Sequence, residues 1–169
     1  GIWPKKVVNY KTVMSDAASG FTSVTYPFPV IRMADLYLMY AEALNEKGED
    51  YATVLPWIDM VRERSGLQGV KESWDQYVGN SKYATQTGLR QIIMQERRIE
   101  LAFEGHYFWD VRRWKTATTE LTQPLTGWKV RYGETDVDYY SENLVLVRDF
   151  TPKMYFWPIK HDELKRNKR

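Results

Sequence analysis

Hydrophobic and polar positions in the first half of the chain follow the period of an α-helix. From about Val30 to Lys47, apolar or small residues occupy nearly every side, and one narrow polar stripe remains through Asp35, Glu42 and Glu46. A helix that is apolar almost all round packs against neighbours on several sides. Gly48 then supplies the kind of residue at which helices end. The pattern therefore predicts a helix with packing partners on several sides.

A second helical pattern extends from about Tyr51 to Ser65. Its apolar stripe consists of Val54, Leu55, Ile58 and Val61. Because proline is tolerated only in the first turn of a helix, Pro56 predicts that the regular part starts late. Two helices joined by a short turn after Gly48 form an antiparallel hairpin. Residues 29–66 are therefore expected to make one tetratricopeptide-like helical hairpin.

Residues 67–86 show no helical period and are rich in glycine, serine and threonine. This composition predicts a long surface loop, and loops of this length are often functional. The loop carries Trp74, Tyr77 and Tyr83, which would suit stacking on a ligand if they are exposed. The alternative is that these rings fold back onto the helices.

A third helical pattern starts near Thr87, runs to about Glu104 and ends at Gly105. With a turn of about 100° per residue, one face of this helix collects the apolar residues Leu89, Ile92, Ile93, Ile99 and Phe103. Glu96 and Glu100 fall inside the same face. Because a buried charge must be paired to avoid a cost of several kcal/mol, these two carboxylates need cationic or backbone donors.

Three arginines could supply those donors. Arg62 lies on the second helix, and Arg112 and Arg113 lie on a short fourth helix over about 106–115. Glu96, Glu100 and these arginines are therefore predicted to form a structural ion-pair core. Residues 87–115 as a whole make a pair of helices that is rich in both charged and aromatic side chains.

After Thr116 the periodicity disappears, and residues 116–169 are expected to be an irregular C-terminal segment with a short strand near 144–147. The stretch 127–140 is polar and aromatic, and Trp128 and Tyr132 within it are further candidates for ligand contacts. Another strand is expected near 21–26. The fold class is accordingly mainly helical, with long irregular loops and little strand.

The amino-acid composition limits the classes of function that the chain can have. The chain of 169 residues has the size of a single domain, and a formal net charge of +2 gives no electrostatic footprint for nucleic acid. It contains no cysteine, which excludes disulfides and thiol chemistry. Seven tryptophans and twelve tyrosines contribute to an aromatic content of 15%, which suits flat ligand surfaces or interfaces and equally an aromatic-rich core.

The charged residues give no support for catalysis. A glycosidase needs two carboxylates that flank the scissile bond, and one of them must have a raised pKa. Glu96 and Glu100 lie one helical turn apart with arginines on both sides, which would keep both of them ionised. His106 and His161 are the only histidines and lack the spacing of a metal site. No enzyme activity, metal site or cofactor is therefore predicted.

Four ordered motifs resemble the SusD/RagB family of outer-membrane nutrient-binding lipoproteins. They are Ile31–Gly48, Ile58–Leu67, the charged and aromatic run Glu96–Lys115, and Phe156–Ile159 followed by Glu163, Leu164 and Asn167. Asp35 stands where the family usually has glutamate. Family members are several times longer, so the chain is identified as a single domain fragment, 1–169, from the C-terminal portion.

The resemblance implies a binding role without catalysis. Such proteins sit on the cell surface of Bacteroidetes-type bacteria, anchored in the outer membrane by an N-terminal lipid that would lie outside this chain. They capture oligosaccharides or polysaccharides, or peptides in some members, and pass them to a SusC-like TonB-dependent transporter. The motif residues are scaffold residues in the family, so no ligand contact can be transferred to a matching position here.

A helical-repeat scaffold for protein partners, without sugar binding, is the alternative. Glycan binding predicts exposed tryptophan or tyrosine rings in a shallow arc on 67–86 or 127–140. A protein scaffold predicts an apolar groove between helices instead.

Overall fold

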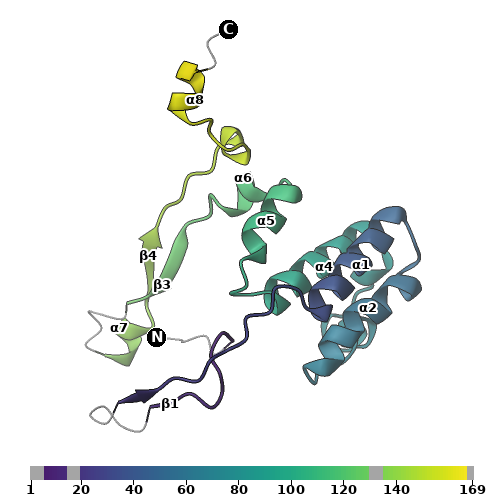
Figure 1. The fold of residues 1–169 in the computed structure, drawn as a ribbon. Coiled ribbons are helices and arrows are strands. Elements are labelled where there is room, and N and C mark those ends of the chain that lie inside the picture. The colour runs from purple at the N-terminus through teal and green to yellow at the C-terminus, as the bar shows by residue number, and fades with distance from the viewer. Residues whose placement is uncertain (1–5, 15–19, 130–134, 167–169) are drawn as a thin grey trace. The chain divides into compact units, whose positions relative to one another are not determined.

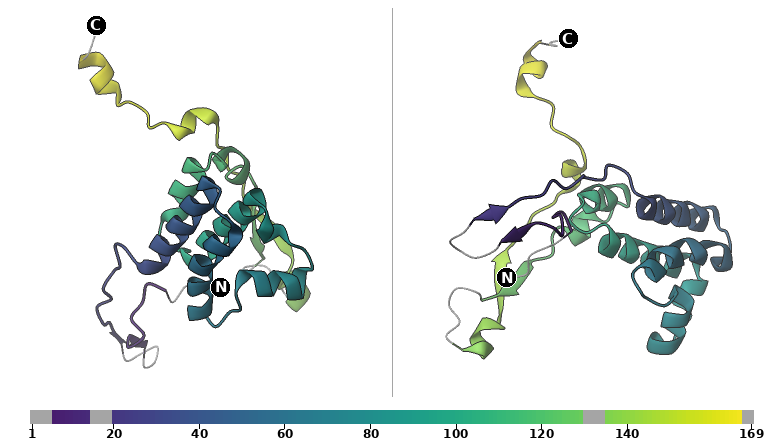
Figure 2. Two further views of the ribbon diagram at one scale, coloured as in Figure 1. Left: turned by 90° about the vertical axis from the view of Figure 1, so that its right-hand side faces the viewer. Right: turned by 60° about the horizontal axis from the view of Figure 1, so that its bottom comes forward.

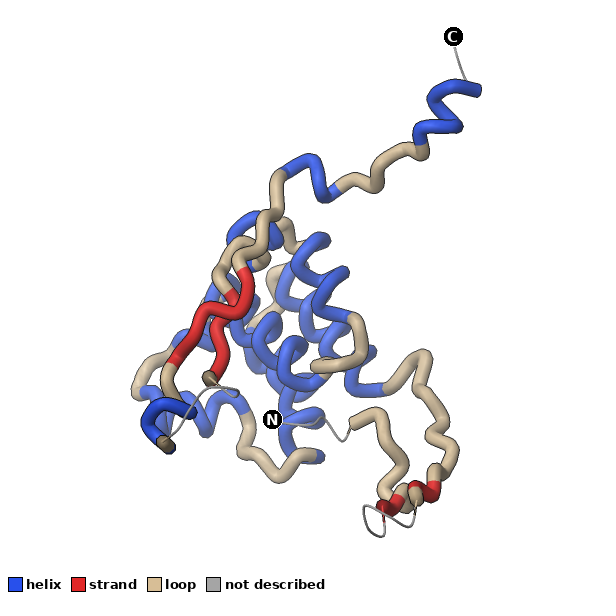
Figure 3. Tube along the Cα trace, turned by 90° about the vertical axis from the view of Figure 1, so that its left-hand side faces the viewer, coloured by secondary structure: helices blue, strands red, loops and turns tan. Residues whose placement is uncertain are grey.

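A computed structural model describes residues 6–14, 20–129 and 135–166 (Figure 1). The chain divides into two compact units, Ile2–Tyr107 and Phe108–Arg169. Helices predominate in the described residues, which also contain two antiparallel sheets of two strands each (Figure 3). The mainly helical fold class expected from the sequence is confirmed, whereas the assignment of 1–169 to one domain stays a prediction.

The first unit is built around three helices, α1 (Met33–Lys47), α2 (Tyr51–Arg64) and α4 (Gln86–Glu100). Both α2 and α4 pack on α1, and the three helices lie side by side (Figure 2). The helices α1 and α2 form the hairpin that the sequence predicts. The fully buried large apolar side chains of this unit are Leu38, Ile58, Leu89, Ile93, Val54 and Val70.

The ends of the first two helices follow from local signals. Gly48 adopts a φ of 88°, and the N–H groups of Gly48 and Glu49 donate to carbonyls in the last turn of α1. The side chain of Asp50 caps α2 by accepting from the N–H of Ala52. The helix then continues through Pro56, so the expected late start is wrong. Pro56 and Ala52 are both exposed, and water can replace the hydrogen bond that proline cannot donate.

The segment after α2 is not the long surface loop that its composition predicts. It forms α3 (Val70–Ser73), a π-helical turn η1 (Trp74–Val78) and a 3₁₀ turn η2 (Lys82–Ala84). The Asp59 carboxylate accepts a hydrogen bond of 2.7 Å from the N–H of Val70 and so caps α3 from the neighbouring helix. Val70 is fully buried, and this contact with α2 holds short turns that would not be stable alone.

The third predicted helix ends earlier than expected. Thr85 caps α4 through a bond of 3.1 Å from the N–H of Gly88, and the helix stops at Glu100 rather than Glu104. A turn follows over 101–105, in which Phe103 and Gly105 have φ values of 66° and 81°. Phe103 in this turn is 70% exposed, and Ile99, in the last turn of α4, is 61% exposed. The predicted apolar face is wrong at both of these positions.

The first unit also contains a short hairpin before α1. Strand β1 (Val13–Met14) pairs with β2 (Phe21–Thr22) in antiparallel fashion. The strand expected near 21–26 is therefore present, although it is shorter.

The second unit has a small core of its own. Its elements are α5 (His106–Arg113, which begins at the end of the first unit), α6 (Ala117–Glu120), β3 (Leu125–Trp128), α7 (Asp136–Tyr139), β4 (Glu142–Leu146), η3 (Pro152–Tyr155) and α8 (His161–Arg166). The buried core consists of Val111, Ala117 and Phe150. Residues 116–169 are thus more regular than predicted, because β3 pairs with β4 in addition to the strand expected at 144–147.

Candidate functional site

The predicted ion-pair residues Arg62 and Glu96 do meet. A guanidinium nitrogen of Arg62 donates to the Glu96 carboxylate, linking α2 to α4. The other nitrogens of Arg62 donate to the carbonyl of Gln68 at 2.8 Å and to the hydroxyl of Ser73 at 3.1 Å. Both charged side chains are largely buried, with 14% and 13% of their surfaces exposed. Arg62 therefore joins three segments of the first unit through a single guanidinium group.

Glu100 has partners other than those expected. It accepts hydrogen bonds from Arg32, which immediately precedes α1, and from Arg64 on α2 at 2.7 Å. The reason is topological. Asn45 and Gln86 are hydrogen-bonded at the opposite end of the same helix pair, so α1 runs antiparallel to α4 and its start lies beside the end of α4. Arg32 and Arg64 thus take the role of donors to Glu100 for which the sequence offered Arg62, Arg112 and Arg113.

Arg112 and Arg113 have partners within the second unit. The Nε of Arg113 donates to Asp110 at 2.8 Å, the spacing of three residues that the sequence allows within a helix. The guanidinium of Arg112 lies 3.6 Å from the centroid of the Phe108 ring, in cation–π geometry. These arginines support their own helix.

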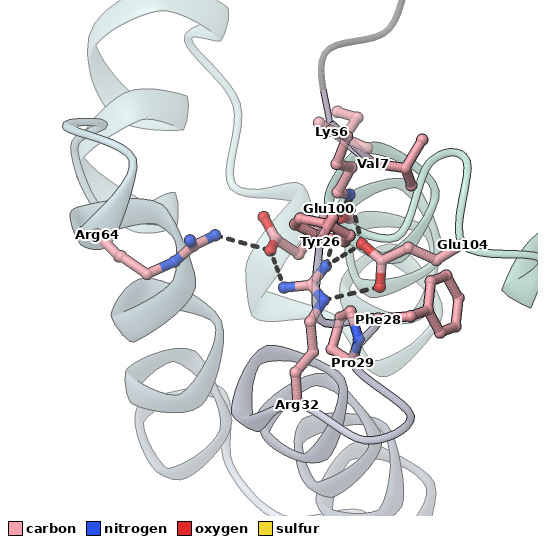
Figure 4. A pocket seen from close by; sticks show the side chains of 10 residues that line it. Lys6, Val7, Tyr26, Phe28, Pro29, Arg32, Arg64, Glu100 and Glu104 are labelled. Carbon is pink, nitrogen blue, oxygen red and sulfur yellow. Dashed lines mark hydrogen bonds and ion pairs between the residues drawn. The ribbon is translucent and has the colours of Figure 1, made fainter. Parts of the chain in front are cut away.

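The network continues from Glu100 to Glu104 and Lys6 (Figure 4). Arg32 holds the Glu104 carboxylate with two bonds, of 2.7 Å and 2.8 Å, and the Lys6 ammonium lies 2.6 Å from it. Lys6 also donates to the carbonyl of Ala102 at 3.1 Å. The turn after α4 is thereby tied to the segment before α1 by charge-assisted hydrogen bonds.

These partners determine the ionisation of the network. Burial by itself would raise the pKa of Glu104, but the hydrogen bonds from Arg32 and Lys6 outweigh it and hold the pKa below its ordinary value. Burial would likewise lower the pKa of Arg32, and the bonds to Glu104 and Glu100 raise it instead. A hollow of about 270 Å³ adjoins these groups and is also lined by Tyr26. A carboxylate held ionised in this way is unsuited to the work of a general acid.

A second buried pair was missed by the sequence reasoning. Arg97 on α4 is 3% exposed and donates to Asp35 on α1 at 2.9 Å. The sequence pattern placed Asp35 on a polar stripe, and the structure shows that this end of the stripe is buried. The available signal was spacing, because Arg97 follows the buried residues Leu89 and Ile93 at intervals of four.

The aromatic candidates in 67–86 differ in accessibility. Tyr83 is only 5% exposed, and its hydroxyl lies 2.8 Å from Asp75, so a stacking role for it is wrong. Trp74 is half-buried against the core of the first unit. Tyr77 is 73% exposed. Two of the three rings thus fold back, as the alternative interpretation held.

The described aromatic candidate in 127–140 is exposed to solvent. Trp128 is 50% exposed and contacts Tyr139 and Tyr140, with ring centroids at 6.5 Å and 5.3 Å. Tyr132 lies outside the described residues.

Among the described residues, no cluster of histidine, aspartate or glutamate side chains fits a metal ion.

Comparison with known proteins shows what kind of protein has this arrangement. The model of the SusD family matches residues 1–169, the whole of the chain. The chain belongs to the SusD family. This family consists of binding proteins without catalytic activity, in agreement with the lowered pKa of the Glu104 carboxyl group.

Solved structures of SusD-like proteins share the fold. A SusD-like protein from Bacteroides fragilis NCTC 9343 is 30% identical with a TM-score of 0.64, over 85% of this chain and 26% of that one. A SusD-like carbohydrate binding protein from the same organism is 31% identical with a TM-score of 0.64, over 81% of this chain and 27% of that one. Both similarities therefore extend over most of the present SusD-family chain.

Relatives of known sequence match over a shorter range. The SusD-like protein P2 of Formosa agariphila is 37% identical over 98 residues, which are 57% of this chain and 18% of that protein. The SusD-like protein P25 of the same organism is 39% identical over 85 residues, 50% of this chain and 15% of that protein. The matched SusD-family segment thus spans less than a fifth of either relative.

Proposed function

We propose that the protein containing this chain binds glycans at the cell surface and delivers them to a SusC-like TonB-dependent transporter in the outer membrane. The observation that carries the proposal is the match of the whole chain to the SusD family, supported by the likeness to a Bacteroides fragilis carbohydrate binding protein. An N-terminal lipid would anchor the protein in that membrane. None of the described helices is long and apolar enough to cross a bilayer.

The distribution of charged residues supports a role in binding. The carboxylates that sequence reasoning weighed for catalysis, Glu96 and Glu100, are each bonded to arginines and serve to join helices. The exposed rings of Tyr77 and Trp128 remain as surfaces on which a sugar can stack. Sugar rings have apolar faces of C–H groups, and aromatic side chains cover such faces without requiring a charged ligand.

Affinity gel electrophoresis tests the proposal. The full-length protein is run through gels that contain starch, xylan, laminarin or galactomannan, and a non-binding protein of similar size serves as the reference. Retardation in at least one gel is expected. Migration equal to the reference in every gel would contradict glycan binding. Co-purification of the tagged protein with the transporter encoded by the neighbouring gene tests the delivery step separately.

One observation favours the alternative of a protein-interaction scaffold. The outer side of α1 exposes Leu36, Met39 and Tyr40 by 41%, 42% and 49%, at the spacing of a helix-packing stripe. This stripe could receive a helix from a partner. Replacing Met39 with glutamate distinguishes the two functions, because it should abolish partner binding by a scaffold and leave the retardation of a glycan-binding protein unchanged.

A further inference from the structure

The helix α7 lies between β3 and β4 in the chain (Figure 1). Three aromatic rings gather beside it, at the end of β3. Trp128 is the last residue of β3, Tyr139 is the last residue of α7, and Tyr140 follows it. The ring centroids of Trp128 and Tyr140 are 5.3 Å apart at an interplanar angle of 81°, and those of Tyr139 and Tyr140 are 5.0 Å apart at 83°. The rings of Trp128 and Tyr140 therefore form two walls of a corner.

These rings do not form a buried core. The core of this unit consists of other residues, Val111, Ala117 and Phe150. Trp128 is 50% exposed and Tyr140 is 62% exposed, whereas Tyr139 is half-buried and supports the other two rings. Two large aromatic side chains thus keep half or more of their surface in water, although they contact one another.

Backbone hydrogen bonds hold the corner in place. The N–H of Lys129 donates to the carbonyl of Tyr139 at 3.1 Å, which joins the end of β3 to α7. The hydroxyl of Thr135 accepts from the N–H of Asp138 at 3.2 Å and caps α7. A platform that is fixed before the ligand arrives loses less conformational entropy on binding.

Polar groups lie beside the rings. Trp128 and Glu142 are direct partners in the antiparallel ladder, so their side chains project from the same face of the hairpin. The exposed carboxylate of Glu142 can accept hydrogen bonds from sugar hydroxyls next to the indole ring. The described charges around the corner are the carboxylates of Asp136, Asp138 and Glu142 against the single ammonium of Lys129, a balance that disfavours an acidic sugar.

We propose that Trp128 and Tyr140 form a stacking platform for one ring of a neutral glycan, with Glu142 accepting hydrogen bonds from its hydroxyl groups. The platform rests on the proposed function, and it adds a site and a ligand class to it. Uncharged hexose or pentose units are the ligands, and polymers of uronic acids are excluded. Tyr139 positions the two stacking rings and does not itself contact the sugar.

Affinity gels with the full-length protein and its Trp128→Ala, Tyr140→Ala and Glu142→Gln variants test the platform. The neutral polysaccharides are starch, xylan, laminarin and galactomannan, and the acidic ones are alginate and polygalacturonate. We expect each alanine variant to bind the retarding neutral polysaccharide about tenfold more weakly, the loss typical of an aromatic residue at the centre of a contact. Trp128→Phe, which keeps an aromatic face, should retain more affinity than Trp128→Ala.

A matched control is Tyr10→Ala, which removes a ring that is 88% exposed from the first unit and should bind like the wild type. Circular dichroism of every variant checks that the fold is retained, and Tyr140→Ala, which removes the other stacking ring, keeps the test decisive if Trp128→Ala does not fold. Wild-type retardation that is unchanged in the Trp128 and Tyr140 variants refutes the platform alone. Retardation by uronate polymers in preference to neutral ones refutes the ligand class. No retardation of the wild type in any gel refutes the proposed function, and the platform with it.

Discussion

Replacing Asp35 with alanine should destabilise the protein strongly, because it removes a carboxylate partner from the buried guanidinium of Arg97. The two side chains are 12% and 3% exposed and are joined by a bond of 2.9 Å. Breaking a buried ion pair by deleting one partner costs about 3–5 kcal/mol, because the remaining charge has little access to water. We expect a value at the lower end of this range, since the Asp35 side chain is not completely buried.

The same two helices supply a matched control. Arg90 on α4 bonds Glu46 on α1 through two contacts, of 2.5 Å and 2.7 Å, but these side chains are 37% and 46% exposed. An exposed pair contributes about 0.2–1 kcal/mol even when its geometry is good. Glu46→Ala should therefore cost much less than Asp35→Ala, although it breaks two hydrogen bonds between the same helices.

Urea denaturation followed by tryptophan fluorescence measures both effects as shifts of the midpoint at constant slope. A double variant, Asp35→Leu with Arg97→Met, should recover most of the loss, because apolar side chains of similar volume can replace a buried pair. Equal costs for Asp35→Ala and Glu46→Ala would refute the reasoning, since burial would then not determine the strength of these pairs.

Three further predictions concern the same unit. Because the pKa of Glu104 is lower in the folded protein than its ordinary value of 4.5, its ion pairs stabilise the protein above that value, and this stabilisation is lost as the pH falls through the folded pKa. Acid titration of stability should therefore show a shallower fall for Glu104→Gln than for the wild type, and parallel curves would contradict this. Gly88→Ala should cost about 2–3 kcal/mol in urea denaturation, because a Cβ would lie 2.1 Å from the carbonyl oxygen of Lys82; a neutral result would refute that contact. Phe103→Gly should increase the free energy of unfolding by up to about 1 kcal/mol and so raise the melting temperature, because Phe103 has a φ of 66° and is largely exposed. A lower melting temperature would mean that the contacts of the ring stabilise the protein by more than the left-handed backbone costs.

The sequence predicted those parts of the fold that depend on local periodicity. The hairpin of α1 and α2 follows from apolar spacing and from Gly48, whose positive φ ends α1. The pairing of Arg62 with Glu96 followed from the need of a partly buried carboxylate for a cation. The hairpin required only local spacing, and the ion pair required one rule about burial.

Other features depend on contacts between segments that are distant in sequence. The helix α4 ends at Glu100 because the chain turns over 101–105 with Phe103 in a left-handed conformation. A glycine is the usual sequence signal for that conformation, and position 103 carries phenylalanine instead. Extending the helical wheel past this point placed Phe103 on the buried face, whereas it is 70% exposed. Within the helix, the wheel assigned Ile99 rather than Arg97 to that face, because an arginine is not expected to be buried. The short helical turns of 67–86 were missed for a similar reason, since the cap of α3 comes from Asp59 on another helix.

The most direct test of the central claim compares the stability and the glycan affinity of one network variant. The claim is that the charged network around α4 holds the fold, whereas the glycan binds elsewhere. Glu100→Gln removes the carboxylate between Arg32 and Arg64, but Arg32 keeps Glu104, so the expected loss of stability is about 1.5–3 kcal/mol rather than the cost of an orphaned charge.

Urea denaturation and affinity electrophoresis on the most strongly retarding polysaccharide should be run on the same full-length preparations of wild type and Glu100→Gln. We expect Glu100→Gln to have a lower denaturation midpoint and an unchanged glycan affinity. A variant of wild-type stability with weakened glycan binding would contradict it, because the network would then belong to the binding site.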